Sequence, residues 1–204
     1  MLIVNGDDFG YSNTVTDPVL AAYDDRLISS ASAMVWMPDS ERAAAAARER
    51  DLPVGLHLNL TVPFRGDIAP ALARELQAEL TTVFDAGSWN DSDAPPQAPD
   101  RRIADAVGHQ LGAFRAQFGE PSHIDGHHHI HVHPAVLGCL PRDIPIRPVL
   151  RAPQDLKRPA DRRDKLISRW FSTPDVCVGL QQIHPALEAR DLTSCPTRAT
   201  TLSR

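Results

Sequence analysis

Cysteine is scarce in this sequence, and its placement excludes the commonest roles of the residue. The three cysteines, Cys139, Cys177 and Cys195, are odd in number and show neither zinc-site nor CxxC spacing. Residues 1–5 lack the charged region and cleavage site of a secretory signal peptide. We therefore expect reduced thiols and a cytoplasmic protein.

Long apolar runs and an excess of positive charge are missing as well. No apolar run approaches the ~20 residues that cross a bilayer, so no membrane partner is expected. The formal net charge of −5 gives no support for nucleic-acid binding, which favours a basic stripe. With 204 residues, 42% of them hydrophobic, the chain suits a single globular domain over residues 1–204.

Short extended segments alternate with helical ones along the chain. We expect strands at residues 2–4, 30–37, 53–61, 123–133, 144–151 and 176–183. Helices are expected at residues 18–23, with Pro18 in the first helical position, and at 41–50, 69–80, 103–118 and 161–171. This alternation predicts an α/β protein with a mostly parallel sheet, although about six strands are fewer than the eight of a closed (β/α)8 barrel.

Two stretches interrupt the alternation. Residues 62–100 contain a Pro/Asp/Ser-rich part and are predicted to form a lid or surface excursion of the same domain. Residues 190–204 form a polar tail in which no element is defined.

Histidines are concentrated in one segment, because six of the nine lie between positions 123 and 133. Read as a strand, this segment turns histidines and Asp125 to one face and mostly apolar residues to the other. Side chains two residues apart, roughly 6.5 Å, can share one metal ion, whereas those four apart, roughly 13 Å, cannot. The segment can therefore supply one or two ligands, chosen among Asp125, His127 and His129, and at least one ligand must come from elsewhere.

Other polar side chains follow strands that are far away in the sequence. Asp7 and Asp8 come directly after the first apolar run, and His57 alternates with leucines. Arg151 and His184 stand at the ends of two later extended segments. Because chemistry gathers at the carboxyl ends of parallel strands, we expect these groups to converge.

A carboxylate and two imidazoles that leave one position open form a usual site for a catalytic divalent metal in hydrolases. In a neighbouring pair of carboxylates, one can bind the metal while the other takes a proton from water. Each group also has a plainer explanation: a helix cap for Asp7 and Asp8, and a hydrogen-bonded structural histidine for His57 or His184.

Two other functions stay open at this point. Another metal-dependent barrel hydrolase, an amidohydrolase or a phosphoesterase, would favour two ions ~3.5–4 Å apart, with phosphate-binding lysines or a glycine-rich loop. The chain has only Lys157 and Lys165, in a helical region away from the motifs. A non-catalytic, histidine-rich metal-binding protein would bind several ions and would need neither Asp7 nor His57.

Four motifs in this order resemble the YdjC-type (ChbG-like) carbohydrate deacetylases, from the first strand to about residue 187. They read DDFG from Asp7, GLHL around His57 with Thr61 after it, HxDxHxHxH from His123, and HP at His184. The resemblance implies a distorted (β/α) TIM-like barrel, closed or incomplete, since family members are longer after Pro134 and at the end. It also implies metal-dependent removal of acetyl groups from N-acetylated sugars such as chitooligosaccharides.

By this resemblance, one divalent ion would be bound by Asp8, His57 and His127, and Asp7 would be the general base. As the general acid we predict His184, with His129 as the second candidate. Asp125 would orient a ligand histidine, and Arg151 would contact the sugar or the developing oxyanion.

The expected partners and cofactor rest partly on this resemblance and partly on the residues themselves. The partner is a small carbohydrate, and the exposed edges of an incomplete barrel make a homodimer reasonable. Two imidazole ligands favour zinc, cobalt or manganese, whereas the family resemblance points to magnesium, for which such a ligand set would be unusual.

Overall fold

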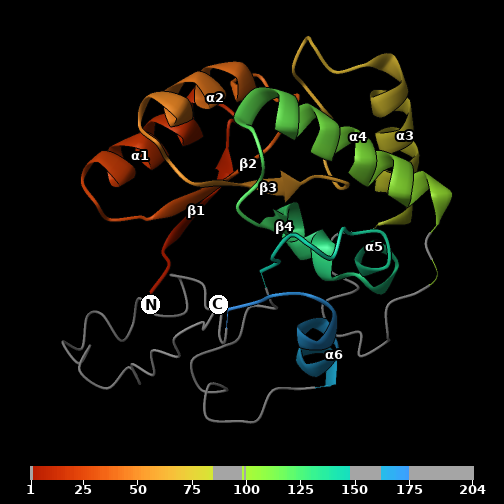
Figure 1. Cartoon of the computed structure of the whole chain (residues 1–204). Helices are drawn as coiled ribbons and strands as arrows, with labels where there is room; N and C mark the ends of the chain where they lie inside the picture. The colour runs from red at the N-terminus through yellow and green to blue at the C-terminus, as the bar shows by residue number, and fades with distance from the viewer. Residues whose placement is uncertain (1, 85–97, 99, 148–161, 175–204) are drawn as a thin grey trace, which may run out of the picture.

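A computed structural model of the protein describes residues 2–84, 98, 100–147 and 162–174 (Figure 1). Its centre is a sheet of four parallel strands in the order β1-β2-β3-β4. The strands are β1 (Asn5–Phe9), β2 (Ser30–Ala33), β3 (Val54–Leu58) and β4 (Ile124–Gly126). The predicted α/β class with a parallel sheet is therefore confirmed.

Six helices accompany the described strands. They are α1 (Asn13–Asp24), α2 (Ser40–Glu49), α3 (Ala71–Val83), α4 (Arg101–Phe118), α5 (Pro134–Leu137) and α6 (Arg162–Trp170). Figure 1 shows α1, α2 and α4 along one side of the sheet. No helix among the described residues has the length and apolar character needed to cross a membrane.

The core follows the alternation of the strands. Leu56 and Leu58 of β3 are fully buried, and so are Ile124 of β4 and Phe114 of α4, which packs against β3. The side chains between the two leucines and after Ile124 are polar, so the sheet has one apolar face and one polar face. The polar face carries the groups that the sequence analysis singled out.

The first strand and the first helix correct two predictions. β1 begins at Asn5, not at residues 2–4, and the side chain of Leu2 is 83% exposed. Asp7 and Asp8 therefore lie inside the strand and not in a loop after it. Helix α1 begins at Asn13, because the carbonyl of Ser12 accepts hydrogen bonds from the residues that follow, so Pro18 lies inside the helix and not at its first position.

The second and third strands are shorter than predicted. β2 ends at Ala33, before residue 37. β3 ends at Leu58 because the Asn59 side chain accepts hydrogen bonds from the backbone N–H groups of Thr61 and Val62, at 3.2 and 3.0 Å. An asparagine side chain that accepts hydrogen bonds from the backbone of the residues after it favours a turn over continued strand pairing.

The prediction of a strand over residues 123–133 is wrong beyond Gly126. Residues His127–Val132 form a 3-10 segment, η1, in which His128 and His129 have φ values of 54° and 58°. The chain folds back over Gly126, where a Cβ atom would lie 3.0 Å from the backbone nitrogen of His131. This close approach favours glycine at position 126, and the 3-10 segment that follows ends the regular alternation of the histidines.

The later segments of the chain agree in part with the predicted elements. Ile146 pairs with Ile124 in a parallel bridge, which confirms an extended piece after residue 144. In the excursion over residues 62–100, Gln77 ties α3 to the end of β3, because its side-chain amide donates to the Asn59 carbonyl at 3.3 Å. The predicted strand at 176–183, the tail at 190–204 and barrel closure lie outside the described residues.

Phe114 provides a test of this packing. Its ring is fully buried and stacks on Phe118, with centroids 4.9 Å apart. We expect Phe114→Ala to lower the free energy of unfolding by about 3–5 kcal/mol, because it removes a buried ring and leaves a cavity. Urea unfolding measures this loss. Arg101→Ala on the exposed start of α4 should change it by less than about 0.5 kcal/mol, and a similarly small effect of Phe114→Ala would contradict the packing.

Candidate functional site

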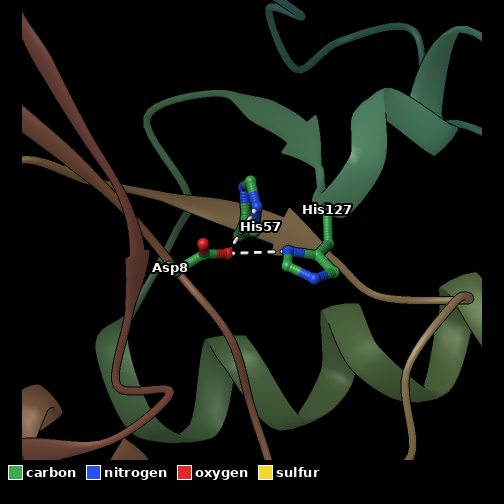
Figure 2. A group of neighbouring side chains, drawn as sticks. All are labelled: Asp8, His57 and His127. Carbon is green, nitrogen blue, oxygen red and sulfur yellow. Dashed lines mark hydrogen bonds and ion pairs between the residues drawn. The ribbon is translucent and has the colours of Figure 1, made fainter. Parts of the chain in front are cut away.

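Three side chains from separate elements converge at the carboxyl end of the sheet. Asp8 comes from β1, His57 from β3, and His127 from the first position of η1 (Figure 2). Asp8 Oδ1 lies 3.0 Å from His57 Nε2 and 2.8 Å from His127 Nδ1. All three potential ligand atoms lie within 4.8 Å of one another. The residues that the family resemblance implies as ligands are thus brought together.

A β-bulge explains why two adjacent aspartates serve one site. In a regular strand their side chains would point to opposite faces. The pairing of β1 with β2 shifts between Gly6 and Phe9, and Asp8 has a φ of 60°. Bulges re-aim side chains in this way, and here the bulge turns Asp8 toward the face that Asp7 already occupies.

His57 lies between two carboxylates. Its Nδ1 is 2.6 Å from Oδ1 of the fully buried Asp125, and its Nε2 faces Asp8. Burial opposes a charge on His57, but Asp125 and Asp8 outweigh it and raise the pKa of His57 from 6.5 to about 10. A carboxylate on the second ring nitrogen of a histidine can orient that histidine as a metal ligand, which is the role predicted for Asp125.

The two carboxylates next to His57 are strongly held in their charged forms. Burial alone would raise the pKa of Asp8, but hydrogen bonds with His127 and His57 hold it well below its usual range. For Asp125, burial is outweighed by His57 and Arg147, and its pKa is also well below the usual range. A charged carboxylate beside two imidazole nitrogens is a donor set that fits a divalent cation.

Asp7 has two partners that the sequence analysis missed. Arg147 Nη1 donates to both Asp7 oxygens, at 2.8 and 2.9 Å, and lies 3.1 Å from Asp125 Oδ2. Asn5 Nδ2 donates to Asp7 Oδ1 at 2.8 Å. The sequence carries a signal for Arg147, since it directly follows the apolar Ile146 in the predicted strand at 144–151, whereas the predicted site residue of that strand is Arg151.

The remaining histidines of the 123–133 segment have separate surroundings. His131 is buried, its Nε2 lies 2.9 Å from the Arg147 carbonyl, and burial followed by Arg147 lowers its pKa to about 3. His133 Nδ1 accepts the N–H of Ala135 at 3.1 Å at the start of α5. The predicted row of histidines on one strand face is therefore wrong, because residues His127–Val132 form η1 in place of a strand.

His128 and His129 are the two residues with positive φ in η1. The ring of His128 lies 4.1 Å from that of His127. His129 is half-buried, and burial together with Arg147 lowers its pKa. Strained backbone of this kind is concentrated at functional sites. His184 and Arg151, the other predicted site residues, lie outside the described residues.

Together, the fold and the site define an α/β protein with a carboxylate–histidine site at the carboxyl ends of parallel strands. The family described as YdjC-like protein matches residues 1–200, and the chain belongs to this family.

Named relatives carry similar sequences. A carbohydrate deacetylase of Brevibacillus brevis is 38% identical over 139 residues, which cover 67% of this chain and 52% of the relative. A chitooligosaccharide deacetylase of Serratia marcescens is 36% identical over 67% of this chain and 52% of its own length. A carbohydrate deacetylase of Geobacillus stearothermophilus is 34% identical over 74% of this chain and 60% of its own. The chain spans about half the length of the curated relatives it matches.

A solved structure shows the same fold. It is the crystal structure of a protein from Enterococcus faecalis V583, provisionally described as a cellobiose-phosphate cleavage protein. The TM-score is 0.63 at 23% identity, and the match covers 92% of this chain and 74% of the other.

The charge on His57 predicts how the stability of the metal-free protein depends on pH. Its folded pKa of about 10 exceeds the ordinary 6.5, so its contribution is complete below pH 6.5 and is lost as the pH rises toward 10. We expect the free energy of unfolding to fall by up to about 1.4 kcal/mol per pH unit in this window. Histidines with lowered pKa, such as His131, titrate below it.

Urea unfolding in the presence of a chelator, from about pH 7 to about pH 8.5, measures this slope. His57→Gln should remove it, because glutamine does not titrate. The exposed His109 of α4 provides a matched control, and His109→Gln should retain the slope. A flat profile for the unmodified protein would show that His57 is neutral in the metal-free fold.

Proposed function

We propose that the protein is a metal-dependent carbohydrate deacetylase that hydrolyses the acetamide group of N-acetylated sugars related to chitooligosaccharides. The observation that carries the proposal is the convergence of Asp8, His57 and His127 on one point, with Asp7 beside them. The names of the relatives support the same activity.

Asp8, His57 and His127 would hold one divalent ion. Such an ion, when bound, lowers the pKa of water and stabilises negative charge on oxygen. Two imidazoles favour zinc as the ion, while the family resemblance favours magnesium, so both belong in the test. His57 would give up the proton that it carries in the metal-free protein and would present Nε2 as the ligand atom.

Asp7 would act as the general base. Its carboxylate is held in one orientation by Arg147 and Asn5, and its side chain is 39% exposed, so water can reach it. After Asp7 takes a proton from water, the hydroxide attacks the acetamide carbon. The C–N bond then breaks as an acid protonates the leaving amine, which releases acetate and the free amino sugar.

His184 stays the first candidate for this acid and His129 the second. A general acid must carry a transferable proton at the pH of the reaction. The lowered pKa of His129 keeps its ring neutral near pH 7, which supports His184. Arg151 stays a proposed contact of the sugar. A cytoplasmic location, a small carbohydrate as the partner and a homodimer complete the proposal.

Acetate release from N-acetylglucosamine oligomers, with the protein loaded with zinc or with magnesium, tests this function. We expect Asp7→Asn to lower kcat by about 10²–10⁴-fold with metal still bound, because only the base is lost. His127→Ala should lower metal affinity as well as kcat. His109→Ala on α4 is the control and should change neither kcat nor metal affinity. Several weakly bound ions, indifferent to His57→Ala, would instead indicate a non-catalytic metal-binding protein.

Arg147 offers a separate test of how the base is held. Arg147→Gln removes the pair of hydrogen bonds to Asp7, and we expect kcat to fall about 10- to 100-fold. Arg147→Lys keeps a positive charge but cannot reproduce the planar guanidinium, so an intermediate loss is expected. Metal content measured beside the rates separates this effect from a loss of the ion. Equal rates for all three proteins would contradict a role for Arg147.

A further inference from the structure

Three neighbouring strands place Ser32, Gly55 and His123 side by side on the polar face of the sheet. Ser32 pairs with Gly55 in the β2–β3 register. On the other side of β3, the N–H of Leu56 donates to the His123 carbonyl at 2.9 Å. With strands ~4.8 Å apart, Ser32 and His123 are separated by roughly 10 Å across the sheet. Their side chains still meet, because His123 Nε2 lies 2.9 Å from Ser32 Oγ.

Gly55 makes this contact across the middle strand geometrically feasible. A Cβ atom at position 55 would lie 2.4 to 2.6 Å from three atoms of the His123 ring. Real Cβ atoms do not approach so closely, so any side chain at position 55 would displace the ring. Glycine inside a strand weakens the strand, and it often marks a place where another group comes close. The His123 ring is the group that comes close here.

The hydroxyl of Ser32 has one hydrogen and three polar neighbours. Asn5 Nδ2 lies at 2.7 Å and can only donate, whereas Asp125 Oδ2 at 2.7 Å is a carboxylate oxygen that only accepts. The hydroxyl hydrogen therefore goes to Asp125, and one lone pair accepts from Asn5. The other lone pair is left for His123, which must carry its hydrogen on Nε2. His123 Nδ1 then faces Ser122 Oγ at 3.0 Å.

We propose that His123 is a positioning residue, which acts through Ser32 and Asp125 on the predicted metal ligand His57. With Oδ2 of Asp125 held by Ser32 at 2.7 Å and by Arg147 at 3.1 Å, Oδ1 is directed to His57 Nδ1 at 2.6 Å. This contact turns Nε2 of His57 toward Asp8. The effect on rate rests on the proposed deacetylase function, while the assignment of the hydrogen on His123 does not.

A double-mutant cycle with metal-loaded protein tests the effect on rate. Gly55→Ala and His123→Ala should each lower kcat by about 10- to 100-fold, as partners of metal ligands do, with KM little changed. The double variant should be no slower than His123→Ala, because the three atoms nearest to the added methyl group all belong to the ring that His123→Ala removes. Gly108→Ala is the matched control, since a Cβ there meets nothing within 4 Å, and it should keep full activity. The proposal would be overturned if the two losses in kcat multiplied in the double variant, or if Gly55→Ala kept full activity.

His123→Gln gives the rescue that a merely structural role would not produce. A glutamine amide can donate to Ser32 from nearly the position of Nε2, so this variant should recover most of the rate that His123→Ala loses. Equal rates for His123→Gln and His123→Ala would contradict the proposed hydrogen bond. If Gly55→Ala does not fold, the comparison of the rates of His123→Gln and His123→Ala still tests the proposal.

Nitrogen NMR of the histidine rings in the metal-free protein tests the assignment without any catalysis. His123 should show a protonated Nε2 and a bare Nδ1, and Ser32→Ala should abolish that fixed form. A protein with this signature but no acetate release would lack the proposed function while retaining the hydrogen-bond chain. Hydrogen on Nδ1 in an active deacetylase would overturn the inference and leave the function standing.

Discussion

The buried carboxylate of Asp125 is the interaction on which the site depends. It is fully buried, and it accepts from Ser32 while it lies within 3.1 Å of both Arg147 and His57. An isolated carboxylate in such a place would cost several kcal/mol, and these partners together offset that cost. Because the partners come from β2, β3 and the segment after β4, one charge couples three parts of the chain.

The same charge organises the groups around it. Arg147 reaches from Asp125 to Asp7, so the proposed base and the orienting carboxylate share one guanidinium. His57 connects Asp125 to Asp8, so the proposed ligand carboxylate is tied to the same centre. A disturbance at any of these residues should therefore spread to the others, because buried hydrogen-bonded charges act as a unit.

Much of the fold follows from local pattern. The alternation of strands and helices predicts a parallel sheet, and the helix predicted from residue 103 begins at Arg101 as α4. The errors fall where local pattern is overridden. Asn59 ends β3 by bonding to the backbone ahead of it, and Gly126 lets the chain fold back where alternation predicts a longer strand.

The sequence by itself determined the class of fold and the residue types of the site, because hydrophobic periodicity and motif spacing are local properties. The family resemblance assigned roles to Asp7, Asp8, His57 and His127, and the pattern of the histidine segment singled out Asp125. Only the tertiary structure selected Arg147 and gave His131 its separate, neutral role. It also decided that Asp7 and Asp8 face the same way. These outcomes depend on a bulge, a strand register and a turn at glycine, which packing between distant segments sets.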